Sequence, residues 1–183
     1  DGAILVVVCS EMPFCNSRVR GELNRLGADI NALPSCTMSV GVDPKGRIKS
    51  VIDGAASAYR VSLLHFKLVQ LSEELSIVII QASISHVMQQ VTSVVTAFPM
   101  IQKQLVNSQV TIAGCSLMDS VTRTEAGGLI GWLAEGNVTL LGYEHVVKTE
   151  AEPRVDLRVG LLAEHPSDAE ACFSRINETE STS

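Results

Sequence analysis

The segment CSEMPFCNS, residues 9 to 17, brings together several side chains that could do chemistry. It offers thiols, a carboxylate, an amide and hydroxyls around Pro13, which stiffens the backbone. An apolar run precedes the segment and a helical pattern follows it, so we expect a loop at a helix N-terminus, where free N–H groups favour an anion. We call this loop the elbow. It is predicted to bind a small anionic group such as an amino acid through Glu11, Met12, Pro13, Phe14, Cys15, Asn16 and Ser17.

The elbow also admits an interpretation without a ligand. Asn16 or Ser17 can cap the helix, with help from Glu11, and the loop would then be an ordinary helix start. A third interpretation is thiol hydrolysis, with Cys15 activated at the helix N-terminus and His65 as its base. The sequence indicates no third group to orient His65, so we expect Cys15 to be a packing residue and predict no catalytic residues.

No metal or nucleotide site is expected in this chain. His86, Tyr143 and His145 lack the spacing of metal ligands. The sequence has no P-loop and no GxGxxG motif after a strand. We therefore predict no cofactor within the chain itself.

Composition narrows the range of partners and compartments. The net charge is −6, and no run of Lys and Arg could follow a phosphate backbone, so nucleic acid is not an expected partner. The longest apolar runs, residues 3–9 and 77–80, are shorter than the roughly 20 residues of a membrane span. Five cysteines without a CxxC pair argue against disulfides and predict a cytoplasmic setting. The first residue is Asp1 and the end is polar, so we expect a piece of a longer protein.

The first half of the chain alternates between strand and helix patterns. The run AILVVVC at 3–9 predicts a strand buried on both faces. Helical spacing follows in Val19, Leu23, Leu26 and Ile30, with Gly27 as a stop. Residues 37–52 predict a hairpin around the turn at 43–46, residues 53–58 a loop, and residues 60–71 a strand.

A long helix is predicted next. Ser72 offers an N-cap, and an apolar helical period runs from 77 to 98, although residues 77–80 also have strand propensity. We expect this helix to end before Pro99, with a short helix through Leu105. The segment QVTIAGC at 109–115 then reads as a short strand.

The remaining residues predict a second, smaller unit. EAGGLIGWLAEGN at 125–137 reads as a helix, VTLLGYEHVVKT at 138–149 as a strand, and VDLRVGLLAE at 155–164 as its hairpin partner. We place the first domain at 1–115 and the start of a following module, with a polar tail, at 116–183. The order βαββα in the first domain predicts an α+β fold, a ferredoxin-like sandwich with helices on one face of an antiparallel sheet.

Several blocks of this sequence resemble known families. The strand, the acid-x-Pro elbow and a helix ending in LNRLGADI resemble the ACT domain, a regulatory module that commonly binds amino acids and pairs with copies of itself. The spacing of the blocks resembles the N-terminal region of the large bacterial NAD-specific glutamate dehydrogenases over about residues 1 to 162. The blocks are MPF at 12–14, SRVRGELNRLG at 17–27, DI at 29–30, Asp43 with GR at 46–47, SLLH at 62–65, WLAEGN at 132–137 and TLLGY at 139–143.

The resemblance implies a non-catalytic regulatory and oligomerisation segment. Its parent would be a cytoplasmic NAD-dependent enzyme that oxidises L-glutamate to 2-oxoglutarate and ammonium, with NAD bound outside this segment. The implied partners are further copies of the chain or the rest of the parent chain, and a small amino-acid effector. A purely structural assembly domain without a ligand is the alternative.

Overall fold

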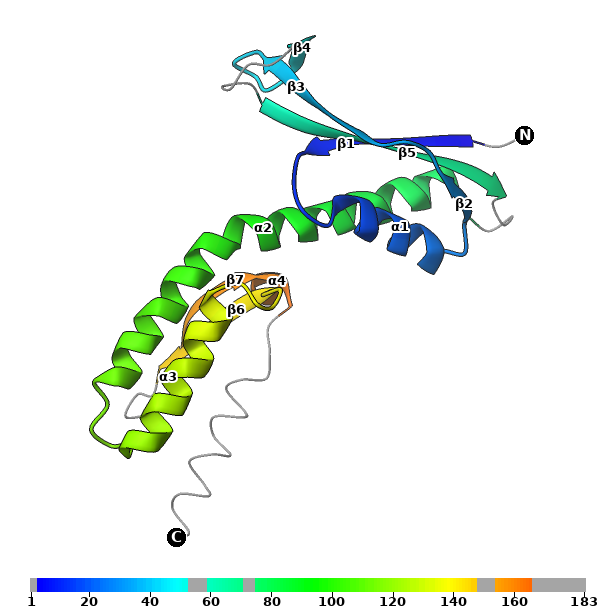
Figure 1. Cartoon of the computed structure of the whole chain (residues 1–183). Coiled ribbons are helices and arrows are strands. Elements are labelled where there is room, and N and C mark those ends of the chain that lie inside the picture. Colours follow the sequence, from blue (N-terminus) through cyan, green and yellow to red (C-terminus); the bar gives the residue numbers. More distant parts are fainter. Residues whose placement is uncertain (1–2, 53–58, 71–74, 148–153, 166–183) are drawn as a thin grey trace. The chain divides into compact units, whose positions relative to one another are not determined.

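The computed structural model describes residues 3–52, 59–70, 75–147 and 154–165. It confirms the mixed α+β class, with a curled antiparallel sheet and helices (Figure 1). Contacts divide the chain into two compact units, Asp1–Thr92 and Ser93–Ser183. This division falls inside the long helix α2 (Ile77–Ala113), earlier in the chain than the boundary expected at residue 115.

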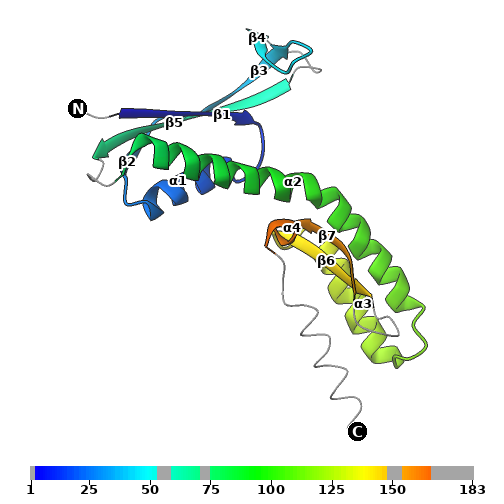
Figure 2. The same cartoon turned by 180° about the vertical axis from the view of Figure 1, so that it is seen from behind.

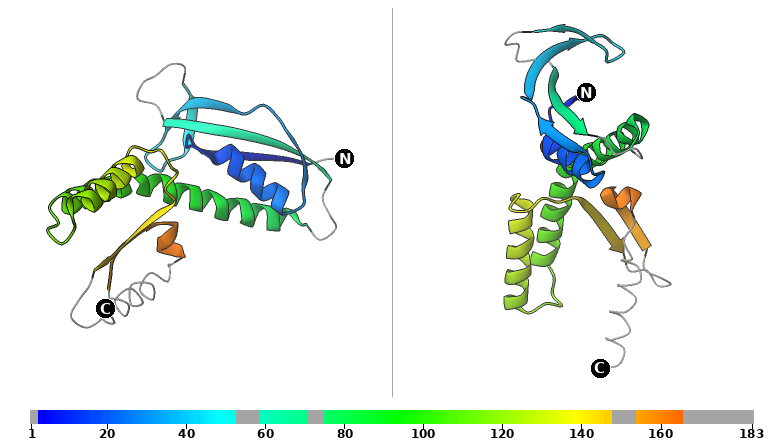
Figure 3. Two further views of the ribbon diagram at one scale, coloured as in Figure 1. Left: turned by 60° about the horizontal axis from the view of Figure 1, so that its bottom comes forward. Right: turned by 90° about the vertical axis from the view of Figure 1, so that its right-hand side faces the viewer.

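The sheet of the first unit is built around its longest strand, β5 (Tyr59–Gln70). β1 (Ala3–Ser10) pairs antiparallel along one side of β5. The other side carries β2 (Asp29–Ala32) and β3 (Cys36–Val42), and β4 (Ile48–Val51) pairs with β3. Figure 3 shows how strongly this sheet curls. The predicted hairpin is confirmed as β3 and β4, whereas β2 was not predicted.

Side chains along β5 point alternately to the two faces of the sheet. Leu64, Phe66 and Leu68 are buried, while Lys67 and Val69 on the alternate positions are exposed. The prediction that β1 is buried on both faces is wrong. Ile4, Val6 and Val8 are 64%, 49% and 53% exposed, because both helices of this unit lie on the other face of the sheet (Figure 2).

Helix α1 (Cys15–Arg25) packs on the sheet through an apolar stripe of Cys15, Val19 and Leu23, all buried. Gly27 follows the helix at φ 74°, a left-handed conformation that confirms the predicted stop. Ile30 was predicted to continue the helical face, which is wrong. Because Gly27 ends the helix, Ile30 lies in β2 instead.

Helix α2 is continuous from Ile77 to Ala113, with Pro99 inside it. The predicted break before Pro99 and the predicted strand at 109–115 are therefore wrong. Proline in a helix interior costs about 3 kcal/mol, but buried side chains on both sides hold the helix together, Val91 and Val94 before Pro99 and Ile101 and Leu105 after it. Ser72 lies outside the described residues, and Ser76 Oγ accepts from the Ile79 N–H at the observed helix start.

In the part of the chain that the structure describes, α2 is long and apolar enough to cross a membrane. Only 17% of the most apolar stretch of α2 is buried, so one face of the helix is exposed to solvent. Ile80, Ile84 and Val91 are buried and polar side chains such as Gln81 and Gln89 alternate with them. We therefore interpret α2 as an amphipathic helix of the fold.

The second unit contains α3 (Ser120–Ala134), the hairpin β6 (Gly142–Val147) and β7 (Arg154–Gly160), and the short α4 (Leu161–Glu164). The predicted helix and hairpin are present, but α3 starts earlier because Asp119 caps it by accepting from Val121 N and Thr122 N. The predicted strand at 138–149 begins only at Gly142. Gln109 Nε2 of α2 donates to the Gly127 carbonyl oxygen of α3 at 3.2 Å, which links the two helices.

Candidate functional site

The elbow joins the end of β1 to the start of α1, as predicted, and is anchored to β5. The Glu11 N–H donates to the Arg60 carbonyl oxygen at 2.9 Å. The Glu11 carboxylate forms an ion pair with the Arg60 guanidinium, whose Nη2 lies 3.2 Å from Oε1. The hydrogen bond from Arg60 holds the pKa of Glu11 below its ordinary value. Glu11 therefore fastens the loop to the sheet and does not cap the helix.

The helix start uses neither of the predicted caps. Phe14 is the N-cap residue, in the left-handed region at φ 68°, and its side chain makes no capping hydrogen bond. Ser17 Oγ donates to the Phe14 carbonyl oxygen at 3.0 Å, and Asn16 Nδ2 donates to Ser35 Oγ at 3.5 Å. In the part of the chain that the structure describes, no side chain therefore accepts from the first N–H groups of α1, and these groups could receive an anion.

The elbow presents an open surface. Pro13, Asn16 and Ser17 are exposed, Phe14 is 49% exposed, and Met12 is half-buried. Apart from the buried Cys15, these predicted residues thus share one accessible loop. Such a loop can hold a small anion by backbone N–H groups and the helix dipole, without any enclosing cavity.

Cys15 is buried, with 3% of its surface exposed, and its neighbour is Cys9 at the end of β1. Cys9 Sγ also donates to the Ser62 carbonyl oxygen at 3.9 Å. Burial, followed by the charge and the hydrogen bond of Cys15, raises the pKa of Cys9 to about 12. Cys9 therefore stays protonated at neutral pH and is a poor nucleophile. The sequence had suggested no link between these two thiols.

The geometry does not assemble a thiol hydrolase. His65 occupies a β5 position on the face opposite Leu64 and Phe66, whereas Cys15 lies on the helix side of the sheet. His65 Nδ1 is 3.3 Å from the Pro34 carbonyl oxygen. A base on the far face of the sheet cannot take a proton from the thiol. Among the described residues, no group of three or more His, Cys, Asp or Glu side chains could hold a metal ion.

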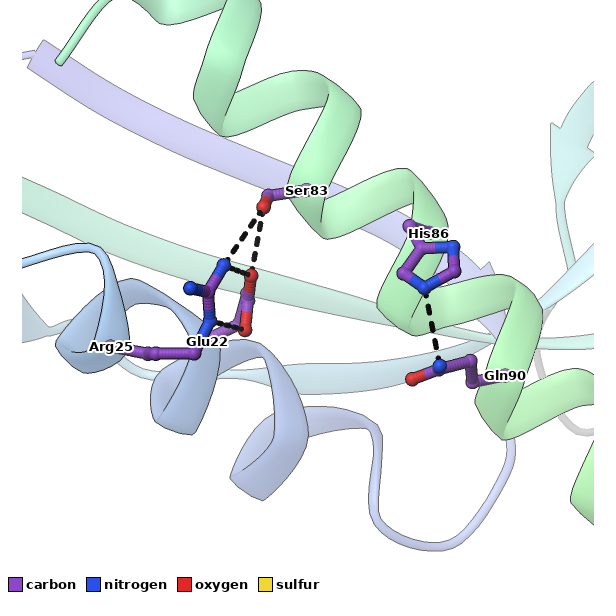
Figure 4. Close-up of polar contacts among 5 residues, drawn as sticks. All are labelled: Glu22, Arg25, Ser83, His86 and Gln90. Atoms are coloured by element: carbon purple, nitrogen blue, oxygen red, sulfur yellow. Dashed lines mark hydrogen bonds and ion pairs between the residues drawn. The ribbon is translucent and has the colours of Figure 1, made fainter. Parts of the chain in front are cut away.

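A polar cluster between the two helices was missed by sequence reasoning (Figure 4). Glu22 Oε1 on α1 accepts from Ser83 Oγ on α2 at 2.8 Å, and both Glu22 oxygens accept from Arg25, at 2.6 and 2.8 Å. The Glu22 side chain is 12% exposed. The Arg25 hydrogen bonds, with smaller help from Ser83 and the charges of Arg25 and His86, lower the pKa of Glu22 to about 2.

A groove lies beside β1 on the helix side of the sheet. Its volume is about 490 Å³, and it is lined by residues 5–9 of β1 and by Gln81, Ile84, Ser85 and Met88 of α2. We call it the β1 groove. None of the predicted elbow residues Glu11 to Ser17 lines it.

The fold and the elbow can now be set beside known proteins. The chain is similar to an NAD-specific glutamate dehydrogenase. Over 155 residues it is 28% identical to that enzyme from Halomonas elongata, and the match covers 82% of this chain but 10% of the relative. A match to so small a part of a long enzyme is consistent with a non-catalytic segment. No protein family description matches the sequence, and no solved structure matches it.

Proposed function

We propose that this chain is a non-catalytic regulatory and oligomerisation segment of a cytoplasmic NAD-dependent glutamate dehydrogenase, whose parent polypeptide oxidises L-glutamate to 2-oxoglutarate and ammonium. The observation that carries the proposal is the similarity to the Halomonas enzyme across 82% of the chain. The sequence adds that no nucleotide-binding glycine motif follows a strand here. NAD would therefore bind to another part of the parent.

The order of strands supports an ACT-like, ferredoxin-like unit. In that arrangement the third main strand lies between the first two, and the helices cover one face of the sheet. Here β5 lies between β1 and the bent pair β2–β3, with antiparallel neighbours throughout. Leu33 and His65 continue the pairing across the bend, because the Leu33 N–H donates to the His65 carbonyl oxygen at 3.1 Å.

The regulatory form of the proposal places an amino-acid effector at the elbow, Glu11 to Ser17. Support comes from the N-terminus of α1, where Phe14 provides no side-chain cap, and from the hydrogen bonds that attach Glu11 to Arg60. Ligand binding regulates the parent only if the ligand prefers one arrangement of subunits over another. The structural form of the proposal leaves the elbow empty and assigns the segment to assembly alone.

Calorimetric titration of the chain with 2-oxoglutarate and the common amino acids tests the regulatory form. Saturable binding is expected, and Ser17→Glu should weaken it about tenfold or more, because a carboxylate then occupies the helix N-terminus. Asn24→Glu, near the other end of α1, is the matched control and should bind as the original chain does.

The mass of the chain in solution, measured beside the titration, separates the two forms of the proposal. Absence of binding together with a defined oligomer would leave the assembly role alone. A monomer that binds none of these ligands and does not associate with the rest of the parent polypeptide would contradict both forms.

A further inference from the structure

Two thiols meet at the ends of the elbow, one on the sheet and one on helix α1. Side chains of β1 alternate between the faces of the sheet, and Cys9 is on the same side as the half-buried Leu5 and Val7, the side that the helices cover (Figure 2). Cys15 begins the buried stripe of α1 that packs on this face. Each thiol therefore faces the other element, and the two are close enough to form a hydrogen bond.

The two thiols differ in how accessible they are. Cys9 is half-buried and lines the β1 groove. Cys15 is covered, with only 3% of its surface exposed. A small molecule that enters the β1 groove can thus reach the Cys9 sulfur first.

Cys9 keeps its proton at neutral pH. Burial, followed by the charge and the hydrogen bond of Cys15, raises the pKa of Cys9 to about 12, and Cys9 Sγ donates to the Ser62 carbonyl oxygen. Exchange with a disulfide requires a thiolate, so Cys9 reacts slowly. The equilibrium is a separate matter, because the fold already holds a second thiol beside the first.

A bond between the two sulfur atoms would close a small ring around the elbow. Residues 10–14 lie between the two cysteines. The sulfur atoms of a disulfide are about 2.05 Å apart, which is closer than two hydrogen-bonded thiols. Oxidation would therefore draw the first residue of α1 toward the end of β1 and fix the loop between them.

We propose that Cys9 and Cys15 form a reversible disulfide across the elbow by exchange with a small-molecule disulfide such as oxidised glutathione. The sulfur of Cys9 attacks the reagent and displaces one small thiolate, which leaves a mixed disulfide on Cys9. The sulfur of Cys15 then attacks the Cys9 sulfur and displaces the second small thiolate. The two protons of the protein thiols pass to the two small thiolates, and the two electrons lost by the protein reduce the reagent.

The inference concerns the same elbow as the proposed function, and its regulatory meaning rests on that function. In a reducing compartment the pair would be reduced at rest and oxidised transiently. The chemistry of the pair can be tested without an effector. A disulfide in a chain that binds no effector would support the inference and remove the regulatory form of the proposed function. Effector binding by a chain that forms no disulfide would do the reverse.

Peptide mapping of the original chain tests the pair. The chain is equilibrated with oxidised and reduced glutathione, alkylated, and cut by a protease that cleaves after glutamate, so that cleavage at Glu11 separates Cys9 from Cys15. After oxidation the two fragments should stay joined and unalkylated, and a dithiol reductant should release them. The equilibrium constant for disulfide formation should be at least about tenfold larger in the folded chain than in urea, because the fold holds the thiols together.

Three variants follow the two steps of the exchange. Cys15→Ala should stop the reaction at the mixed disulfide on Cys9, because the second thiol is missing. Cys9→Ser should leave the covered Cys15 unmodified. Cys36→Ser, which removes an exposed thiol of β3, is the matched control and should leave the disulfide unchanged. Circular dichroism verifies the fold of each variant.

The comparison with urea uses the original chain, so it decides the matter even if a variant fails to fold. Fragments that are not joined after oxidation of the folded chain would overturn the proposal. An equilibrium constant no larger than in urea, or a mixed disulfide that persists on Cys9 of the original chain, would overturn it as well.

Discussion

Single side chains connect elements that are distant in the sequence. Glu11 pairs with Arg60 across 49 positions, and Glu22 accepts from Ser83 across 61. Both carboxylates lie on the first β-α segment, and both have a lowered pKa because their partners stabilise the charged form. Glu22 is the more enclosed of the two, so its loss should be easier to measure.

Glu22 should make the folding stability depend on pH in acid. Its folded pKa is about 2, below the ordinary 4.5, so its contribution is fully present above pH 4.5 and is lost as the pH falls toward 2. Glu22→Gln should cost about 1 kcal/mol of unfolding free energy at neutral pH, since the exposure of Arg25 weakens the ion pair. Urea unfolding at several pH values measures both effects.

The matched control for this prediction is Glu125→Gln, at an exposed position of α3. It should change the unfolding free energy by less than about 0.5 kcal/mol. Equal losses from the two substitutions, or a Glu22→Gln loss that does not shrink as the pH falls from 4.5 to 2, would contradict the assigned role.

At the scale of helices and strands, local sequence patterns predicted where most of these elements lie. They failed where tertiary packing determined the structure. The alternation of apolar residues along β5 and the apolar stripe of α1 could be predicted from the sequence, because apolar residues recur there with the period of a strand and of a helix. The sequence did not predict that α2 continues past Pro99, because proline is a strong local signal for the end of a helix. Residues buried on both sides of Pro99 outweigh that signal, and such burial is known only once the neighbouring elements are in place.

Replacing Pro99 should stabilise the chain. Pro99→Ala restores a helix N–H and removes the clash with the preceding turn, so a gain of about 1 to 3 kcal/mol in unfolding free energy is expected. Thermal and urea unfolding followed by circular dichroism measure the gain. Lys103→Ala, at an exposed position of the same helix, serves as the control and should change stability little. Destabilisation by Pro99→Ala would show that the helix requires the proline geometry.

At the scale of the whole molecule, the described part of the chain leaves apolar side chains exposed on β1 and on α2. Its sheet has an uncovered apolar edge, and α2 keeps an open face. The similar stretch forms 10% of the Halomonas enzyme. The proposed regulatory and assembly role accounts for these features together, since exposed apolar surface of this kind marks contact sites.

The purified chain should not oxidise glutamate. With L-glutamate and NAD supplied, formation of NADH should stay at the level of a protein-free blank, because the sequence has no dinucleotide-binding motif. A commercial glutamate dehydrogenase in the same cuvette verifies the assay. NADH formation that scales with the amount of chain would contradict the non-catalytic assignment.

The sequence by itself determined the local structure of this protein. Gly27 and Gly46 both adopt positive φ, where Gly27 ends a helix and Gly46 forms a turn. The spacing of apolar residues in α1 and β5 determines which side chains face the core. Tertiary structure decided the rest: that β1 is an edge strand, that Cys9 adjoins Cys15, and that Glu11 binds Arg60. Local propensity depends on residues a few positions apart, whereas these features depend on which strands become neighbours and which faces the helices cover.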